Sequence, residues 1–131
     1  MNTLMKSIAL AAASLLLLGC ATMGIVPLGA GDWVLARWQP TDAYYYPGIV
    51  TERVGDDLSI QYDDGDTGTQ RAMNVRRFDW HAGTHLECQF TDGNWYPATI
   101  TEMGSTRIDM RIRYDDGDRQ ATDTSKCRVH S

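Results

Sequence analysis

Short alternations of apolar and polar residues cover the chain beyond residue 30, and this period of two predicts β-strands. In one run Val34 and Ala36 fall on the same face, and in a later run Leu58, Ile60 and Tyr62 do so. An Asp-Gly pair follows the later run, and glycine tolerates the positive φ of a tight hairpin turn. No window beyond the first nineteen residues has a convincing helical period, so the pattern predicts an all-β fold.

A repeat runs through this strand pattern. The residues Tyr-Asp-Asp-Gly-Asp occupy positions 62–66 and return at 114–118, an offset of 52. Tyr-Pro at 46–47 returns at 96–97, an offset of 50. The offsets differ because the first copy has a longer loop after its first strand, whereas the second has a longer loop after Glu102. The chain therefore contains two copies of one small unit.

Each copy is too small to form two packed sheets. Five short strands in roughly 45 residues can instead form one strongly bent sheet that closes on itself and hides its edges. We therefore predict two small five-stranded barrels in tandem, at residues 31–77 and 83–131, joined by a linker at 78–82. Phe78 and Trp80 stand at alternate positions of the linker, and we expect at least one of them to fill the seam between the barrels.

The N-terminus has the pattern of an export signal over residues 1–19. Its apolar stretch is too short to span a bilayer and ends at Gly19-Cys20. Residues 17–20 resemble the lipobox of bacterial lipoproteins, which implies cleavage before Cys20, acyl chains such as palmitate on that cysteine, and a short tether over residues 20–30. The alternative is an ordinary signal peptide with an incidental cysteine. In the enterobacterial sorting pattern, Ala21 in place of Asp favours the outer membrane, so the predicted location is the cell envelope, lipid-anchored and facing the periplasm.

The exported chain is acidic. After loss of Lys6 it keeps 11 basic residues against 17 acidic ones, a formal net charge of −6. A negative protein has no general attraction to nucleic acid, so we expect no nucleic-acid partner, whereas cationic partners fit. The arginines, Arg107 and Arg128 among them, fall largely at positions that face away from the predicted cores. There they form a solvated face or, alternatively, contact anionic peptidoglycan or lipid A phosphates.

Two cysteines remain besides Cys20. Cys88 and Cys127 lie on the first and last predicted strands of the second copy, which are neighbours in a small closed barrel, and their counterparts Ala36 and Val75 are an apolar pair. Because export implies an oxidising compartment, the favoured interpretation is a disulfide. The alternative is two buried thiols that act as small hydrophobic side chains.

With the strands laid out, the chain resembles the Tudor family, here in tandem. The matching segments are residues 34–38, 44–50 and 58–65, kept in the second copy at 86–90, 95–100 and 112–117. Tudor domains that recognise methylated lysine or arginine use an aromatic cage with an acidic residue at its lip. Carried over by position, the implied ligand-binding residues are Trp38, Tyr46, Tyr62 and Asp64 in the first copy and Phe90, Tyr96, Tyr114 and Asp116 in the second.

This implied cage is physically coherent, because ring faces attract a poorly hydrated cation and the carboxylate adds opposite charge. Some cages have a further aromatic residue two positions beyond the acid, where this chain has Asp66 and Asp118. That difference favours a cation with N–H donors or a guanidinium. Since Trp38 offers the larger ring, we expect the better pocket in the first copy. The alternative is that these aromatic residues simply fill the cores of two small barrels.

Other chemistries find less support. The Asp-rich turns lack the ligand spacing of an EF-hand, which leaves at most weak Ca²⁺ association, and the three histidines are scattered, so we expect no metal site. We find no nucleophile–base pair, phosphate loop or paired catalytic carboxylates and expect no enzyme and no cofactor. The predicted function is a periplasmic binding module for a cationic group or peptide on an envelope protein. The alternative is a scaffolding lipoprotein that contacts peptidoglycan or a partner protein.

Overall fold

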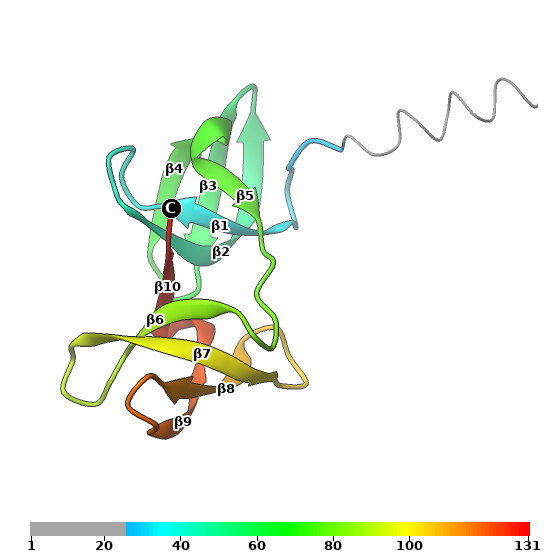
Figure 1. The fold of residues 1–131 in the computed structure, drawn as a ribbon. Coiled ribbons are helices and arrows are strands. Elements are labelled where there is room, and N and C mark those ends of the chain that lie inside the picture. The colour runs from blue at the N-terminus through cyan, green and yellow to red at the C-terminus, as the bar shows by residue number, and fades with distance from the viewer. Residues whose placement is uncertain (1–25) are drawn as a thin grey trace, which may run out of the picture.

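A computed structural model describes residues 26–131, which form ten β-strands and two 3₁₀ turns (Figure 1). The strands of the first unit are β1 (Trp33–Arg37), β2 (Tyr44–Val54), β3 (Asp57–Tyr62), β4 (Thr67–Arg71) and β5 (Val75–Arg77). Those of the second are β6 (His85–Gln89), β7 (Trp95–Met103), β8 (Asp109–Tyr114), β9 (Arg119–Asp123) and β10 (Cys127–His130). The turns η1 (Ala72–Asn74) and η2 (Thr124–Lys126) precede the last strand of each unit.

The predicted all-β fold is confirmed for this part of the chain. The predicted signal peptide and Cys20 lie outside the described residues. Within residues 26–131, no helix has the length and apolar character needed to cross a bilayer.

Strand pairing is the same in both units. β1 pairs antiparallel with β2 and β6 with β7, and each pair continues through two further antiparallel strands, β3–β4 and β8–β9. The last strand of each unit returns to the first, β5 to β1 and β10 to β6. Both long strands have a register shift at the same place, between Val50 and Glu52 and between Ile100 and Glu102. Such bulges bend a strand, so each sheet curls around its own core.

The sheet of each unit does not close into the complete barrel that we expected from the sequence. Among the described strands, β4 does not pair with β5, nor β9 with β10. In each unit a 3₁₀ turn stands between these two strands, and it carries the chain across the opening without ladder hydrogen bonds.

The repeat places equivalent side chains in two cores. The first core contains Val34, Ala36, Val50, Leu58, Ile60, Tyr62 and Val75. The second contains their counterparts Leu86, Cys88, Ile100, Met110, Ile112, Tyr114 and Cys127. The alternation of apolar residues therefore predicts the buried face of each sheet correctly in both copies.

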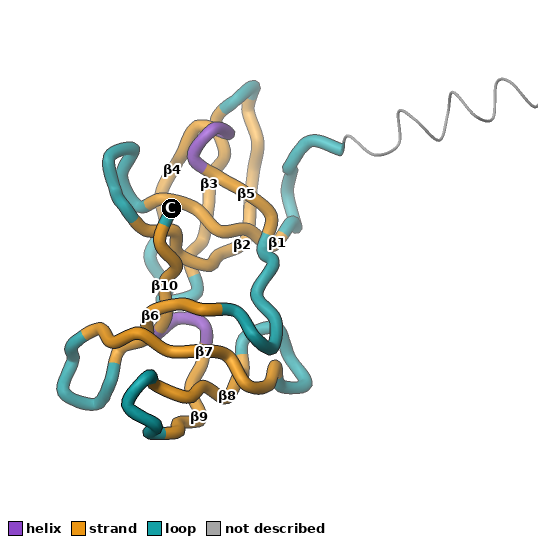
Figure 2. The backbone as a smooth tube through the Cα atoms, viewed as in Figure 1, coloured by secondary structure: helices purple, strands orange, loops and turns teal. Residues whose placement is uncertain are grey.

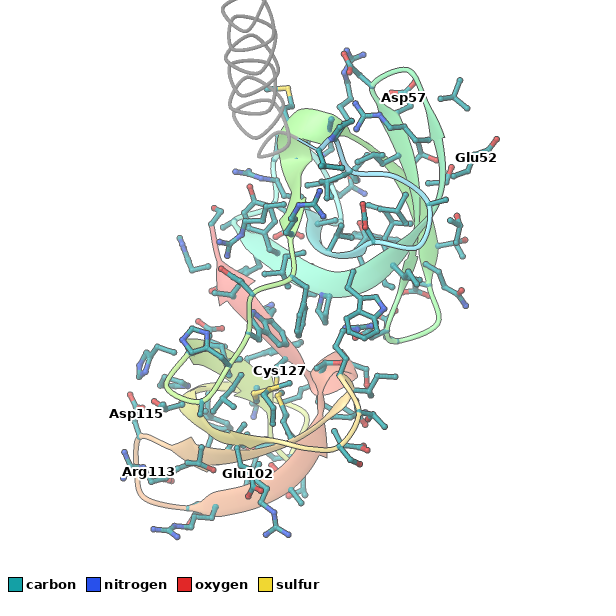
Figure 3. All side chains as sticks on the ribbon, turned by 90° about the vertical axis from the view of Figure 1, so that its right-hand side faces the viewer. Glu52, Asp57, Glu102, Arg113, Asp115 and Cys127 are labelled. Atoms are coloured by element: carbon teal, nitrogen blue, oxygen red, sulfur yellow. A yellow bond between two sulfur atoms is a disulfide. The ribbon has the colours of Figure 1, made fainter. Side chains whose placement is uncertain are left out.

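Cys88 and Cys127 face each other directly in the β6–β10 pairing and form the predicted disulfide (Figure 3). Ala36 and Val75 occupy the same paired position on β1 and β5 of the first unit. The bond joins residues separated by 39 positions. By the loss of loop entropy in the unfolded chain, a cross-link of that span stabilises the second unit by about 4 kcal/mol.

The two units share a strand and a seam. β10 continues beyond β6 and pairs with the start of β2, Val129 opposite Tyr45, so that Figure 2 shows one sheet path running through both units. In the linker, Trp80 is only 5% exposed and packs in the core of the second unit together with Leu35, from the outer side of β1. The expectation that a linker aromatic fills the seam is confirmed for Trp80, and Phe78 packs beside it, half-buried.

A buried ion pair also crosses the seam. Arg107, in the β7–β8 loop, donates hydrogen bonds of 2.9 and 2.7 Å to the two carboxylate oxygens of Asp63, in the β3–β4 turn. Their side chains are 7% and 5% exposed, and Thr124 donates a further hydrogen bond to Asp63. The guanidinium lies 4.9 Å from the ring centroids of both Trp33 and Phe78.

A second arginine lies at the same seam. The guanidinium of Arg128, on β10, lies 3.8 Å from the ring centroid of Tyr44 and 4.1 Å from that of Trp95, and it donates to Glu87 at 3.1 Å. The expectation of a solvated face is therefore wrong for Arg107 and Arg128. The extra residues in the β7–β8 loop carry the first across to the neighbouring unit, and the β10–β2 pairing covers the second.

We predict that Arg107→Ala lowers the free energy of unfolding by about 3–5 kcal/mol, because it leaves the Asp63 carboxylate buried without its partner. Urea denaturation measures the change. Arg111→Ala is the control, since its 4.0 Å contact with Glu102 is exposed, and it should change stability by less than about 0.5 kcal/mol. Equal losses in the two variants would contradict the prediction.

Candidate functional site

The predicted residues of the first unit surround one hollow. It has a volume of about 200 Å³ and is lined by Trp38, Tyr46, Tyr62, Asp64 and Asp66. Trp38 follows β1, Tyr46 lies on β2, and Tyr62 ends β3. Trp38 meets Tyr62 edge-on, with 5.3 Å between the ring centroids and 68° between the planes. Since Trp38 is 42% exposed and Tyr62 only 3%, the first forms an open wall and the second a buried floor.

Tyr62 is therefore both a core residue and part of the site. Its hydroxyl donates to the carbonyl oxygen of Arg37 at 2.5 Å. Burial, followed by the charges of Asp42 and Asp64, raises the pKa of Tyr62, so the phenol stays neutral. Gly68 on β4 lies against this pair of rings, since a Cβ added there would be in ordinary van der Waals contact, at 3.5 Å, with both Trp38 and Tyr62.

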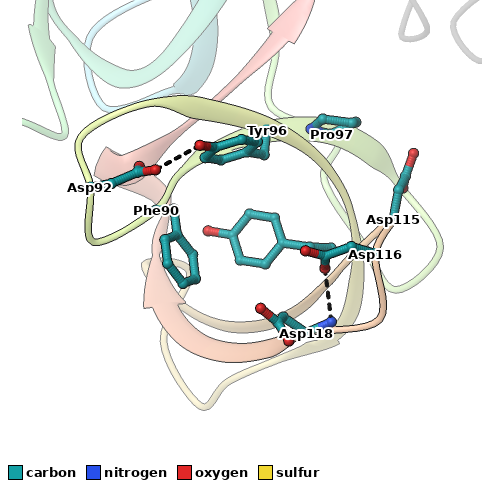
Figure 4. Close-up of a pocket in the computed structure, with 8 residues that line it drawn as sticks. Phe90, Asp92, Tyr96, Pro97, Asp115, Asp116 and Asp118 are labelled. Carbon is teal, nitrogen blue, oxygen red and sulfur yellow. Dashed lines mark hydrogen bonds between the residues drawn. The ribbon is translucent and has the colours of Figure 1, made fainter.

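The equivalent hollow of the second unit is larger (Figure 4). Its volume is about 380 Å³, and it is lined by Phe90, Asp92, Tyr96, Pro97, Tyr114, Asp115, Asp116 and Asp118. Phe90, Tyr96 and Tyr114 pack edge to face, with centroids 5.5 to 6.4 Å apart and planes at 77° to 89°. The three mutually perpendicular rings thus form three sides of a box, a geometry that aromatic pairs favour.

The structure thus brings together all four predicted residues in each copy, but the larger hollow is not in the copy that we expected. The large indole of Trp38 lies against Tyr62 and Gly68 and takes up space itself. Phe90 is smaller and leaves the corresponding space open. In both copies the floor tyrosine, Tyr62 or Tyr114, is also a core residue, so the structural interpretation of these two rings holds beside the functional one.

Asp92 lines the second hollow and was missed in the sequence. It lies in the loop between β6 and β7, where the Tyr96 hydroxyl donates to its carboxylate at 2.6 Å and the Asn94 amide donates to its other oxygen at 2.9 Å. The Tyr96 bond, with the backbone bond from Asn94, stabilises the charged carboxylate and lowers the pKa of Asp92, while the same bond raises the pKa of Tyr96. Asp42 stands at the equivalent position of the first unit, four residues before Tyr46, and its carboxylate accepts from the Tyr44 amide at 3.0 Å, but it does not line the first hollow.

The acidic rims are built by the same turn in both units. The amide of Asp66 donates to Asp64 at 2.9 Å, and the amide of Asp118 donates to Asp116 at 3.0 Å. The intervening glycine of each turn has a φ of 95° or 98°, which an L-residue rarely adopts. The repeated Asp-Asp-Gly-Asp sequence therefore specifies a turn that holds its carboxylates in a fixed orientation.

Carboxylates dominate the charge at both hollows. Within residues 26–131, no ion pair shorter than 4.0 Å involves the rim carboxylates, which are Asp64, Asp66, Asp92, Asp116 and Asp118. Ring faces attract cations, and uncompensated carboxylates raise the local concentration of cations. The arrangement suits the binding of a positively charged group.

Comparison with known families agrees with this geometry. The family model described as the DNA repair protein Crb2 Tudor domain matches residues 30–78, which contain all five strands of the first unit. The first unit is similar to Tudor domains. The second unit shares the pairing, bulge, core positions and rim turn of this Tudor-like domain.

Two solved structures of tandem Agenet domains are also similar to the chain. The crystal structure of Arabidopsis thaliana AGDP1 AGD34 is 14% identical, with 79% of this chain and 83% of that one covered and a TM-score of 0.40. The crystal structure of the ADCP1 tandem Agenet domain 3-4 is 16% identical, with 79% and 81% covered and a TM-score of 0.37. None of the curated proteins matches the sequence.

We predict that Tyr96→Phe raises the pKa of Asp92, because the lost hydroxyl stabilises the ionised carboxylate. NMR titration of the Asp92 carboxyl carbon measures this pKa, and the midpoint of the titration should move to higher pH. Tyr46→Phe is the matched control, since it removes the equivalent hydroxyl of the first Tudor-like unit and should leave Asp92 unchanged. If Asp92 titrates alike in wild type and Tyr96→Phe, the assigned hydrogen bond does not determine its charge.

Proposed function

We propose that this chain is a non-enzymatic binding module in which two Tudor-like barrels, residues 31–77 and 83–131, each bind a cationic group in an aromatic hollow. The observation that carries the proposal is the recurrence of ring walls and an acidic turn at the same place in both units. The binding residues are Trp38, Tyr46, Tyr62 and Asp64 in the first unit and Phe90, Tyr96, Tyr114 and Asp116 in the second.

The strength of such a site limits what it can bind alone. Exposed rings contribute roughly 0.5–1 kcal/mol each to a bound cation, and a solvent-screened carboxylate adds no more than that. One hollow therefore corresponds to roughly millimolar binding of a single cation. Two hollows acting on one ligand gain affinity through effective concentration. The partner we propose is accordingly a peptide or envelope protein with several cationic groups, methylated lysine or arginine among them.

The proposed location rests on the N-terminal sequence pattern. In this proposal residues 1–19 are a signal peptide, Cys20 carries the lipid, and residues 20–30 tether the module to the outer membrane on its periplasmic side. Anchoring many copies in one membrane would present their hollows together, which supplies the multivalency that weak sites need.

A second candidate function is a scaffold that contacts anionic peptidoglycan. Arg113 on β8, labelled in Figure 3, lies directly opposite Arg119 on β9, and both are exposed. Like charges in that position repel, and a polyanion would relieve the repulsion. Retention on purified peptidoglycan that falls with salt and survives Trp38→Ala and Tyr96→Ala would favour the scaffold.

We predict that tetramethylammonium and methylguanidinium shift amide NMR signals around both hollows, with dissociation constants of roughly millimolar size. Trp38→Ala and Tyr96→Ala each remove one exposed ring and should weaken binding roughly two- to fivefold at their own hollow only. Each variant is thus the control for the other, and neither ring is a core residue. Titrations in which no signal of either hollow moves would contradict the proposed function.

We also predict that the mature chain carries the added mass of acyl chains on Cys20 and that Cys20→Ser loses this added mass, because the thiol that accepts the lipid is absent. Fractionation and the intact mass of the mature chain measure this. Ala21→Asp is the matched control, which should keep the lipid but move the protein to the inner membrane. A wild-type mature chain whose intact mass shows no acyl group would exclude the lipid anchor.

A further inference from the structure

The second hollow has acidic groups at two opposite ends. Asp92 lies at one rim, on the β6–β7 loop, and Asp116 and Asp118 lie at the other, on the β8–β9 turn, with the rings between them (Figure 4). The charges of Asp92 and Asp116 both add to the effect of burial in raising the pKa of Tyr114, whose hydroxyl therefore senses both rims. The hollow thus has two anionic poles separated by an aromatic middle.

The carboxylates at both poles are oriented by their own turns. One oxygen of Asp92 accepts from the Asn94 amide and the other from the Tyr96 hydroxyl, while one oxygen of Asp116 accepts from the Asp118 amide. An ionised carboxylate has about four acceptor positions, so each of these groups can accept further N–H donors from a ligand.

The two hollows differ in size and charge. A volume of about 380 Å³ falls within the range of roughly 300–1,000 Å³ that is typical of small-molecule sites, whereas the first hollow, with about 200 Å³, falls below it. The carboxylates that line the first hollow, Asp64 and Asp66, lie on one turn only, and Asp42, the counterpart of Asp92, does not line it. A ligand with two separated charges therefore fits the second hollow and not the first.

We infer that the second hollow binds a linear alkyl chain with two ammonium groups that keep their N–H donors. One ammonium donates to Asp92, the other donates to Asp116 and Asp118, and the methylene groups between them contact Phe90 and Tyr114. A free polyamine and a pair of neighbouring lysine side chains share this chemistry. The inference rests on the proposed function, since it concerns the same hollow, and it specifies the ligand class.

Two expectations follow from the chemistry of this ligand. A quaternary ammonium has no N–H donor and cannot form charge-assisted hydrogen bonds with either pole. The second ammonium of a diamine adds an ion pair that a monoamine of the same length lacks. An exposed pair of this kind strengthens binding roughly three- to fivefold.

The test is an NMR titration of the mature chain with putrescine, spermidine, butylamine, tetramethylammonium and the dipeptide Lys-Lys at one ionic strength, because salt screens these contacts. Signals of the second hollow should show putrescine and spermidine binding roughly three- to fivefold more tightly than butylamine. Asp92→Asn and Asp116→Asn should each remove this preference, since the amide keeps the oxygen that accepts within the turn but loses the charge. Asp64→Asn, the equivalent of Asp116 in the first unit, should retain it.

The outcomes separate the two proposals. If butylamine binds the second hollow as tightly as putrescine, or tetramethylammonium binds more tightly than both, the diammonium ligand is excluded while the binding module stands. If no cation moves the signals of either hollow, both are excluded. Given a preference for two ammonium groups, tighter binding of Lys-Lys than of putrescine assigns a peptide as the source, and the reverse order assigns a free polyamine.

Discussion

The ion pair between Arg107 and Asp63 is the contact on which the arrangement of the two units depends. Both side chains are buried, so either charge without its partner would be strongly unfavourable. Trp33 and Phe78 lie close to the guanidinium, and the amide of Asp63 donates to the carbonyl oxygen of Pro47 on β2. The pair therefore ties a loop of the second unit to the β3–β4 turn of the first.

That turn also carries the acidic rim of the first hollow. Asp64 and Asp66 follow directly after Asp63, so the residue that anchors the seam is the neighbour of the residues that face the hollow. The second unit has the same turn without the anchor, because Asp115 is exposed and has only a 3.8 Å contact with His85. Because the two units pack head to tail, each presents a different surface to the seam. The equivalent residues Asp63 and Asp115 therefore lie in different environments.

The local part of this structure could be predicted from the sequence. Alternation assigns Leu58 and Ile60 to the core, and the Asp-Gly pairs assign the turns, because a strand's buried face and a turn's positive φ are decided by a few neighbouring residues. The repeat also aligned Cys88 with Ala36, which placed both at equivalent paired positions.

The contacts between units could not be predicted in the same way. The sequence shows that the loop after Glu102 is longer, but which surface Arg107 reaches depends on how one unit sits on the other. The same holds for Arg128, whose partners Tyr44 and Glu87 come from different units. Asp92 was missed for a related reason, because it lies in a loop whose length differs between the copies, and whether an acid there faces the hollow depends on that loop: Asp92 lines the second hollow, whereas its counterpart Asp42 does not line the first.

The seam also gives the wall tyrosines of the two hollows, which are built on one skeleton, different hydrogen-bond partners. Arg128 of the second unit, which is paired with Glu87, also donates to the Tyr46 hydroxyl at 3.5 Å, so a guanidinium lies beside one wall of the first hollow. Tyr96, the counterpart of Tyr46, donates instead to the carboxylate of Asp92. One wall tyrosine therefore faces a cation and the other an anion. The wall tyrosine of the second hollow therefore orients an additional carboxylate, which the lining of the first hollow lacks.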